Sequence, residues 1–317
     1  MKEKILFALI NFTLKAIALL PYSVLYLLSS MIYPILYYLV RYRRKVVRKN
    51  LVNSFPDKSE KEIIDIEKKF YRHFCDYVLE TVKLLHISDE EIRRRMRFTN
   101  SELIEELRED GRPFFIYLGH QCNWEYIISI TLWISPSITA YQIYHPLSNK
   151  IMDKLIYRLR SRFNSIGLPQ KQAVRSILTL VREGKQPLVG LIADQRPPKY
   201  PEPEWMTFMN QETPVFTGTE RIAKQVNACI YYIDMQRPRR GYYHGVFKKV
   251  EWKTDAAKEF PITEAYMHLL EETIGRAPAY WLWSHNRWKR TRAMAEQLQA
   301  EQEKRKEERI KANQPKK

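Results

Sequence analysis

The sequence predicts an α/β fold, in which a mostly parallel mixed sheet is flanked by helices and preceded by a membrane-associated helical segment. Apolar runs at 114–118 and 187–193, bounded by Gly and Pro, have the length and composition of buried central strands. These runs alternate with amphipathic stretches of helical length, an order typical of parallel sheets. The first forty residues are almost continuously apolar, which predicts a segment separate from that sheet.

Residues 1–40 are predicted to be a retained membrane anchor. The apolar stretch from Ile5 to Val40 is too long for the core of a signal peptide and lacks a convincing cleavage site. Residues 21–40 alone reach the length that crosses a bilayer, although a segment lying in the membrane surface would have the same composition. A buried hydrophobic hairpin of the globular domain is the alternative.

A basic cluster follows the apolar segment and consists of Arg41, Arg43, Arg44, Lys45, Arg48 and Lys49. Such clusters stay on the cytoplasmic side and are attracted to anionic lipids, so the following domain is expected on the cytoplasmic face of the plasma membrane. The net charge of +17 fits an anionic lipid or an acidic protein partner. A nucleic-acid partner is disfavoured, because no motif of the usual binding modules is present and the apolar segment would be unexplained.

The other elements are predicted in chain order. Residues 57–85 form one or two amphipathic helices within a basic linker region, 41–100. Within a main domain, 101–290, helices are predicted over 101–109, 123–133, 147–163, 172–183, 219–226 and 263–274, and strands over 114–119, 139–144, 187–193, 228–234, 242–250 and 280–283. The later strands could pair antiparallel. The charged tail, 291–317, is either a solvated helix or disordered.

The three cysteines, Cys75, Cys122 and Cys229, have neither metal-ligand spacing nor an even count for a disulfide framework. They fit a reducing compartment. The histidines add no closed coordination set, so no metal and no cofactor is expected.

The motif Gly119-His120-Gln121-Cys122-Asn123-Trp124-Glu125 directly follows a predicted buried strand. The carboxyl end of such a strand is where catalytic groups of open α/β sheets tend to lie. Asn123 is a plausible N-cap, which would put Glu125 in the first turn of the next helix. There Glu125 could fix the His120 tautomer, giving a dyad in which His120 takes a proton.

Several motifs in one order resemble the late acyltransferases of lipid A biosynthesis. They are Arg48-Lys49-Asn50-Leu51 with Ser54-Phe55-Pro56-Asp57, then His120 to Glu125, then Asp194-Gln195, then Tyr280-Trp281-Leu282-Trp283-Ser284-His285-Asn286-Arg287-Trp288-Lys289. The resemblance covers roughly residues 40–290. That family is similar in turn to the glycerol-phosphate acyltransferase superfamily, with its H-x4-D/E dyad. It implies a bacterial inner-membrane enzyme that moves a fatty acyl chain from acyl carrier protein onto a hydroxyl of a lipid A precursor, a phosphorylated glycolipid.

Acyl transfer needs a base, donors for the oxyanion and a water-poor site. His120 with Glu125 would supply the base. No G-x-S-x-G elbow is present, and the resemblance implies direct attack by the acceptor hydroxyl, although Cys122 could in principle act as a nucleophile.

The resemblance also implies roles for other residues. Arg160, with its neighbour Arg162, lies where the family's acyl-donor or transition-state arginine falls, although this chain has Asn149-Lys150 where the family often has Asn-Pro. Asp194 and Gln195 match a pair that would bind the acceptor or organise a loop. His285, Arg287 and Lys289 match a C-terminal basic pattern, in which Asn286 and Trp288 depart from the family. Surface or structural roles are the alternative for all of these residues.

Two other functions stay open. An acyltransferase acting on an aminolipid or another phosphoglycolipid would use the same dyad. A catalytically silent membrane-binding scaffold would share the fold, because fold alone does not fix function. The length of the acyl chain cannot be read from the sequence.

Overall fold

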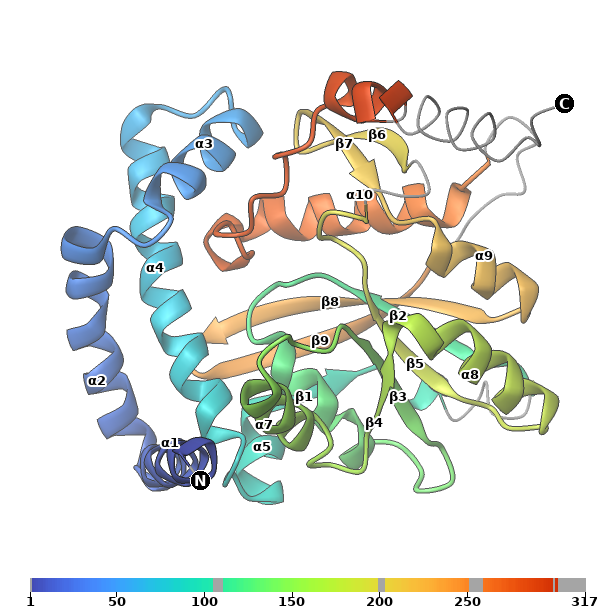
Figure 1. The fold of residues 1–317 in the computed structure, drawn as a ribbon, viewed down its shortest axis with the longest axis horizontal. Coiled ribbons are helices and arrows are strands. Elements are labelled where there is room, and N and C mark those ends of the chain that lie inside the picture. The colour runs from blue at the N-terminus through green and yellow to red at the C-terminus, as the bar shows by residue number, and fades with distance from the viewer. Residues whose placement is uncertain (1, 105–110, 199–202, 251–258, 299, 302–317) are drawn as a thin grey trace, which may run out of the picture.

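A seven-stranded sheet forms the centre of the computed structural model, which describes residues 2–104, 111–198, 203–250, 259–298 and 300–301 (Figure 1). Its strand order is β1-β9-β8-β2-β5-β3-β4. Five neighbouring strands run parallel: β8 (Cys229–Arg239), β2 (Phe114–Leu118), β5 (Leu188–Ile192), β3 (Ala140–Tyr144) and β4 (Ile166–Pro169). β9 (Tyr242–Lys249) pairs antiparallel with β8, and β1 (Met96–Thr99) runs parallel to β9. The predicted mostly parallel α/β fold is confirmed.

Helices cover both faces of this sheet (Figure 1). The helices of the main body are α3 (Arg44–Ser54), α4 (Glu60–Lys83), α5 (Asp89–Arg95), η2 (Trp124–Leu132), α7 (Lys150–Arg160), α8 (Gln170–Arg182), α9 (Gly218–Gln225), α10 (Pro261–Arg276) and the short η3 (Pro278–Tyr280). A separate hairpin is formed by β6 (Glu204–Phe208) and β7 (Gln211–Val215). Helix α4 begins with a capping box between Ser59 and Glu62, which satisfies backbone donors at its first turn.

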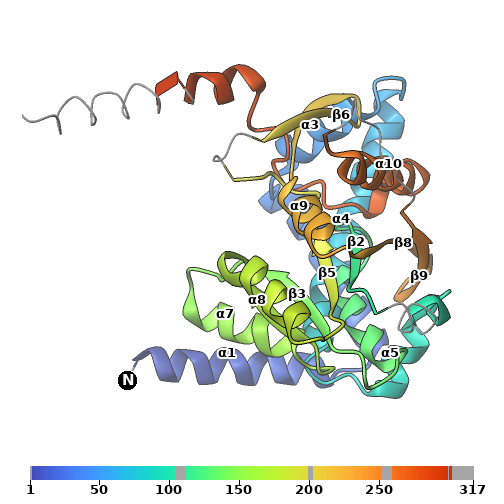
Figure 2. The same cartoon turned by 90° about the vertical axis from the view of Figure 1, so that its right-hand side faces the viewer.

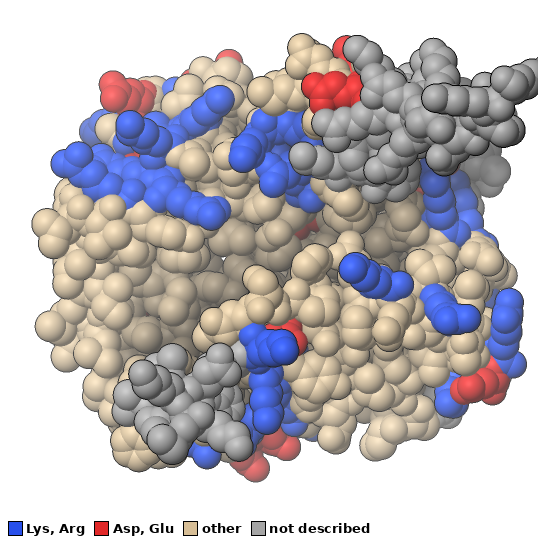
Figure 3. All heavy atoms as spheres, viewed as in Figure 1, with Lys and Arg blue, Asp and Glu red and all other residues tan. Residues whose placement is uncertain are grey.

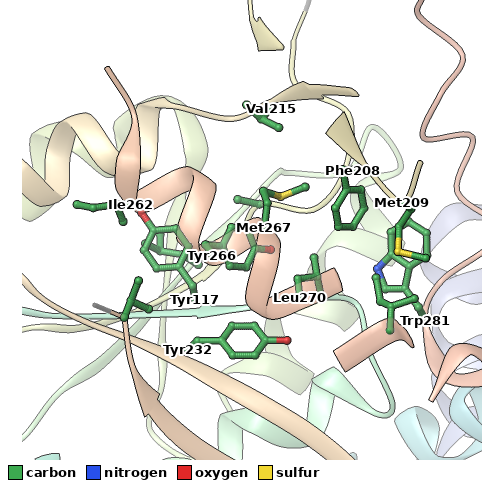
Figure 4. Packing of buried hydrophobic residues seen from close by; sticks show 14 of the residues in the cluster. Tyr117, Phe208, Met209, Val215, Tyr232, Ile262, Tyr266, Met267, Leu270 and Trp281 are labelled. Atoms are coloured by element: carbon green, nitrogen blue, oxygen red, sulfur yellow. The ribbon is translucent and has the colours of Figure 1, made fainter. Parts of the chain in front are cut away.

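Strand β2 is paired along both edges with parallel strands, and it is buried on both faces because helices cover the two sides of the sheet. Phe115 and Tyr117 belong to one hydrophobic cluster, and Phe114, Ile116 and Leu118 belong to another on the opposite face. The first cluster packs Tyr117 with Tyr232, Tyr266 and Leu270 under α10 (Figure 4). Burial of both faces explains why residues 114–118 are apolar at every position. The residues that follow β2 are therefore held by a strand that is fixed on both sides.

The N-terminal segment forms α1 (Lys2–Leu19), α2 (Tyr22–Pro34) and a π-helical turn η1 (Ile35–Val40). The segment Tyr22–Val40 is long and apolar enough to cross a bilayer, and only 17% of this apolar stretch is buried inside the protein. Helix α2 lies beside α4 and is tied to it by polar contacts: Tyr26 Oη donates to Glu80 at 2.8 Å and Ser29 Oγ to Asp76 at 2.6 Å. Figure 2 shows α1 along the lower edge, with the N-terminus at the periphery.

The outer side of this segment exposes large apolar side chains. Leu27, Met31 and Leu39 are 62%, 59% and 79% exposed. Figure 3 shows Lys and Arg gathered over α3, directly above the uncharged surface of α2. The structure therefore has an apolar surface bordered by a basic one, with one side of α2 attached to the folded domain.

Several sequence predictions need correction or lie outside the described residues. The predicted strand at 280–283 is wrong, because its backbone forms η3 and then only an isolated bridge between Trp281 and Gln121. The helix predicted over 123–133 is present as a 3₁₀ helix, η2. Strands β1, β4, β6 and β7 were not predicted. Part of the helix predicted over 101–109 and residues 302–317 of the tail lie outside the described residues; residues 292–298 are helical.

Candidate active site

His120 follows β2 after a single glycine. The Cβ of any other residue at 119 would come within 2.4 Å of Leu270 and 3.3 Å of Asp194 Oδ2. Gly119 therefore allows Asp194, which lies two residues beyond the end of β5, to approach the backbone closely. Because Leu118 pairs with Ile192 in register, His120 and Asp194 both lie two residues past paired strand ends.

Asp194 holds His120 through two contacts. The backbone N–H of His120 donates to Asp194 Oδ2 at 2.8 Å, and Nδ1 of the ring lies 2.5 Å from Oδ1. Trp281 Nε1 donates to Oδ2 at 2.8 Å. The Asp194 side chain is 1% exposed and that of His120 is 17% exposed. Burial acts to raise the pKa of Asp194, but the charge of His120 and these hydrogen bonds bring that pKa below its ordinary value.

An ionised Asp194 fixes the tautomer of His120. The carboxylate can only accept, so Nδ1 carries the proton and Nε2 is left with a lone pair. Gln195 Nε2 lies 3.1 Å from that nitrogen and donates to it. His120 Nε2 is thus the position from which a substrate proton could be taken, and a substrate hydroxyl there would displace the Gln195 amide.

An aromatic ring and a paired backbone segment lie beside the imidazole. The His120 ring meets the Trp124 ring edge-to-face at 5.0 Å. The segment after η3 pairs with the segment after β2: Leu282 N donates to His120 O at 3.0 Å, and Cys122 N donates to Tyr280 O at 2.8 Å. Figure 3 shows the surface hollowed at the centre of this face, between the uncharged surface over α2 and the part of the molecule that carries α7. The predicted strand at 280–283 thus serves as a wall of the site rather than as part of the sheet.

Cys122 is fully buried and has a left-handed backbone conformation, with φ of 56°. Burial raises the pKa of its thiol above the ordinary value, so a thiolate is disfavoured. His73, which the sequence analysis did not select, lies with Nε2 3.1 Å from the Cys122 carbonyl. Burial lowers the pKa of His73 to about 3, so the neutral ring donates to that carbonyl and supports the unusual loop.

Glu125 is not the partner of His120 in this structure. Its carboxylate accepts from Arg160 Nε at 2.9 Å and from Nη2 at 2.6 Å, a bidentate pair. Glu125 is 5% exposed at its side chain and Arg160 is 27% exposed. The expected contact between Glu125 and the imidazole is therefore replaced by Asp194, because the strand register brings Asp194 to Nδ1 while η2 turns Glu125 toward α7.

Two other predicted site residues contact the scaffold. Asn123 does not cap η2 with its side chain; it is fully buried, and its Nδ2 donates to Glu80 Oε2 at 2.8 Å. Arg162 donates to the carbonyl of Ile87, at the turn before α5. Asn123 therefore joins α4 to the loop that carries His120, while Arg162 does not share the Glu125 carboxylate with Arg160.

The C-terminal motif lies partly beside the site. His285 Nε2 accepts from the backbone N–H of Arg196 at 3.4 Å. Burial lowers the pKa of His285 to about 4, so it is neutral near pH 7. Arg287 is fully buried and donates to the carbonyl of Pro214 at 2.6 Å, whereas Lys289 is exposed. Burial also lowers the pKa of Arg287 to about 10. Arg287 thus holds the β6–β7 hairpin.

The Arg48-Lys49-Asn50-Leu51 motif and the C-terminal motif that begins at Tyr280 are joined in the structure through Asn50. Its Nδ2 donates to the carbonyls of Trp283 and His285 at 2.9 and 3.0 Å. Arg43 Nη1 adds a contact to the Ser284 carbonyl at 3.1 Å. The basic region before α4 therefore fastens the turn that follows Trp281. In the sequence, these contacts of Arg43 and Asn50 are indicated only by the presence of both motifs in one chain.

Together these contacts give an imidazole that is oriented by a carboxylate and packed against an aromatic ring, which suits general-base chemistry on a hydroxyl. Within the described ranges, no three His, Cys, Asp or Glu side chains gather in the way that a metal ion requires.

Comparison with known proteins agrees with this chemistry. The profile described as "Bacterial lipid A biosynthesis acyltransferase" matches residues 1–290. The chain is also similar to the lipid A biosynthesis lauroyltransferase of Escherichia coli (strain K12), with 23% identity over 272 residues, 85% of this chain and 87% of that protein. The match to the family profile spans the apolar segment, the sheet and every motif described above. The chain therefore belongs to the family of bacterial lipid A biosynthesis acyltransferases.

Proposed function

We propose that the protein transfers a fatty acyl chain from an acyl carrier protein thioester to a hydroxyl of a lipid A precursor, with His120 as general base. The observation that carries this proposal is the buried Asp194 carboxylate against His120 Nδ1, which leaves Nε2 ready to accept a proton. The hydroxyl oxygen attacks the thioester carbonyl and its proton passes to Nε2. When the tetrahedral intermediate collapses, the C–S bond breaks and the pantetheine sulfur takes that proton back from Nε2, so it leaves as a thiol and His120 is again neutral.

Glu125 acts in this proposal through Arg160. The bidentate contact holds the guanidinium in one orientation, and a permanently charged donor of this kind suits a developing oxyanion or a substrate phosphate. The side-chain amide of Gln195 donates to His120 Nε2 until the hydroxyl of the acceptor takes its place. His285 and Lys289 lie on the motif after Trp281 and would face the acceptor, while Arg287 acts as a support for the hairpin.

The experiment that tests the function is a transfer assay with purified protein, followed by mass spectrometry of the lipid products. Acyl carrier protein thioester and coenzyme A thioester are compared as donors, and a lipid A precursor and an aminolipid as acceptors. We expect a new acyl ester on the lipid A precursor with the carrier-protein donor. Acylation of the aminolipid alone would contradict the acceptor, and equal use of coenzyme A would contradict the donor.

Direct transfer predicts that Cys122 is dispensable as a nucleophile. We expect Cys122→Ala to retain activity within about tenfold of the native protein, because the replaced thiol is protonated and buried. Intact-protein mass spectrometry after mixing with the donor should detect no acyl adduct on Cys122. An adduct that forms and decays at the rate of turnover would contradict direct transfer.

We propose further that the apolar face of α2 and η1 rests in the membrane surface, with the basic cluster over α3 against anionic headgroups on the cytoplasmic side. The polar contacts of Tyr26 and Ser29 with α4 favour this arrangement over a free spanning helix. A helix attached on one side to a soluble domain and apolar on the other is typical of interfacial binding.

Replacing exposed apolar residues tests this arrangement. The variant Leu27→Gln/Met31→Gln/Leu39→Gln should leave the membrane fraction in high salt, since the remaining electrostatic attraction is screened within about 8 Å at physiological ionic strength. The native chain should remain membrane-bound until detergent is added. The control Leu147→Gln/Val174→Gln/Met294→Gln replaces three exposed apolar residues elsewhere. Release of the native chain by salt alone would contradict the anchor.

A further inference from the structure

A pocket of about 570 Å³ lies between α2, α4 and the connection from β8 to β9. Ser29 and Ser30 line it from α2, Lys69 and Arg72 from α4, and Arg237 to Arg240 from the end of β8 and the turn that follows. We propose that this pocket binds the phosphate of a membrane lipid headgroup. The proposal does not depend on the catalytic role of His120.

The pocket carries a large excess of positive charge. Its cations are Lys69, Arg72, Arg237, Arg239 and Arg240, and its only lining carboxylate among the described residues is Asp76. Asp76 is buried and accepts from Arg237 Nη2 at 2.9 Å and from Arg240 Nη2 at 2.6 Å. Within the described residues, Lys69, Arg72 and Arg239 have no carboxylate within ion-pair distance. An anion entering the pocket would therefore meet three uncompensated cations.

The buried guanidinium of Arg237 also favours the binding of an anion in the pocket. Its side chain is 9% exposed, and its Nε has no hydrogen-bond partner in the described part of the chain. Burying a guanidinium is costly unless its charge and its donors are satisfied. Asp76 is shared with Arg240, so it satisfies Arg237 only in part. A phosphate with several acceptor oxygens would supply the missing partner after a small shift of the side chain.

Aromatic rings hold the arginines of the pocket in place. Arg72 lies 5.0 Å from the centre of the Tyr33 ring, Arg239 lies 3.8 Å from that of Tyr242, and Arg237 lies 5.0 Å from that of Tyr280. Since the guanidinium groups are positioned before a ligand binds, little side-chain entropy would be lost on binding. Planar guanidinium forks also match the geometry of phosphate oxygens.

The setting favours a lipid phosphate over a free one. The pocket is lined by Ser29, Ser30 and Tyr33 of α2, the helix whose outer side exposes Leu27 and Met31. A headgroup in the pocket could therefore keep its acyl chains along the apolar surface of α2. The volume is within the range of small-molecule pockets and can hold a glycerol-phosphate headgroup.

This pocket is separate from the catalytic centre. Strand β8 runs parallel to β2, so the β8–β9 turn lies at the same sheet edge as His120. Tyr280 lines the pocket and also an aromatic cluster that includes Trp124 and Trp281. Those two indoles contact His120 and Asp194. Tyr280 therefore stands between the lipid phosphate site and the reacting groups.

The test titrates full-length protein in zwitterionic micelles with short-chain phosphatidylglycerol, measured by calorimetry. Short-chain phosphatidylcholine and inorganic phosphate serve as comparison probes. We expect saturable binding of phosphatidylglycerol and weaker binding of both comparison probes. Equal affinity for inorganic phosphate would overturn the assignment to a lipid, and equal affinity for phosphatidylcholine would overturn the assignment to an anionic headgroup.

Neutral variants locate the site. Arg72→Gln and Arg239→Gln should each weaken phosphatidylglycerol binding roughly fivefold, the equivalent of about 1 kcal/mol for each cation near an anionic lipid. The control Lys171→Gln/Arg175→Gln removes two positive charges from the exposed side of α8 and so matches the double variant Arg72→Gln/Arg239→Gln. Equal weakening by this control would show that binding follows net charge only, and an unchanged Arg72→Gln/Arg239→Gln double variant would overturn the site.

Two further measurements separate this proposal from the catalytic one and identify the lipid. His120→Ala should bind phosphatidylglycerol as the native protein does, so loss of catalysis with retained binding concerns His120 alone. If the bound phosphate belongs to the acceptor, Arg72→Gln/Arg239→Gln raises KM for the acceptor and leaves kcat unchanged. If it belongs to a bulk phospholipid, KM for the acceptor is unchanged while phosphatidylglycerol binding falls.

Discussion

Replacing His120 with alanine is expected to lower the rate of acyl transfer about a hundredfold to ten-thousandfold, the range typical of a lost general base. The reason is specific to Nε2, which is the ring nitrogen that can accept the hydroxyl proton once Asp194 holds the proton on Nδ1. The rate is measured with acyl carrier protein thioester and lipid A precursor at saturating concentrations, so that the change is assigned to kcat.

The loss must occur in a folded protein. Circular dichroism and the thermal midpoint of His120→Ala are compared with those of the native chain. His145→Ala is a matched control, because His145 is exposed and its ring contacts only its neighbouring carbonyl, that of Pro146, among the described residues. Turnover of folded His120→Ala near the native rate would remove His120 from the mechanism.

The position of His120 could be predicted from the sequence because a fully buried strand leaves a strong signal. Residues 114–118 are apolar at every position, and Gly119 ends the run. Asp194 likewise follows a predicted buried strand, the apolar run 187–193. Its contact with His120 was not predicted, because it depends on the register between β2 and β5, and pairing between distant strands is not visible in local patterns.

The errors have equally specific causes. Trp281 and Trp283 are buried on either side of a less buried Leu282, which imitates the alternation of a strand although the backbone pairs only once. Strands β1 and β4 are short and partly exposed at the two edges of the sheet, so their apolar signal is weak. Glu125 was paired with His120 on spacing, on the expected helix start at Asn123 and on the H-x4-D/E resemblance, whereas the choice between His120 and Arg160 depends on the tertiary position of α7.

Changing Asp194 to asparagine is expected to lower kcat on the order of a thousandfold while retaining the shape of the site. An amide can donate to Nδ1, which would move the ring proton to Nε2 and remove the basic lone pair. It would also weaken the contact with Trp281.

Because the folded-state pKa of Asp194 lies below its ordinary value, the stability that its ionised form contributes is present above the ordinary aspartate pKa and lost as pH falls below it. Stability of Asp194→Asn should therefore depend less on pH in that acidic range than stability of the native chain.

Three double-mutant cycles distinguish the two carboxylates. If Asp194 acts through His120, the variant His120→Ala/Asp194→Asn should be little slower than the slower single variant, because residues that work as a unit are non-additive. Glu125→Gln should instead add its full loss to that of His120→Ala, and its loss should disappear in the background of Arg160→Gln, since its carboxylate contacts Arg160. Additive losses for His120 and Asp194, together with non-additive losses for His120 and Glu125, would return Glu125 to the dyad and show that the contact with Asp194 is structural.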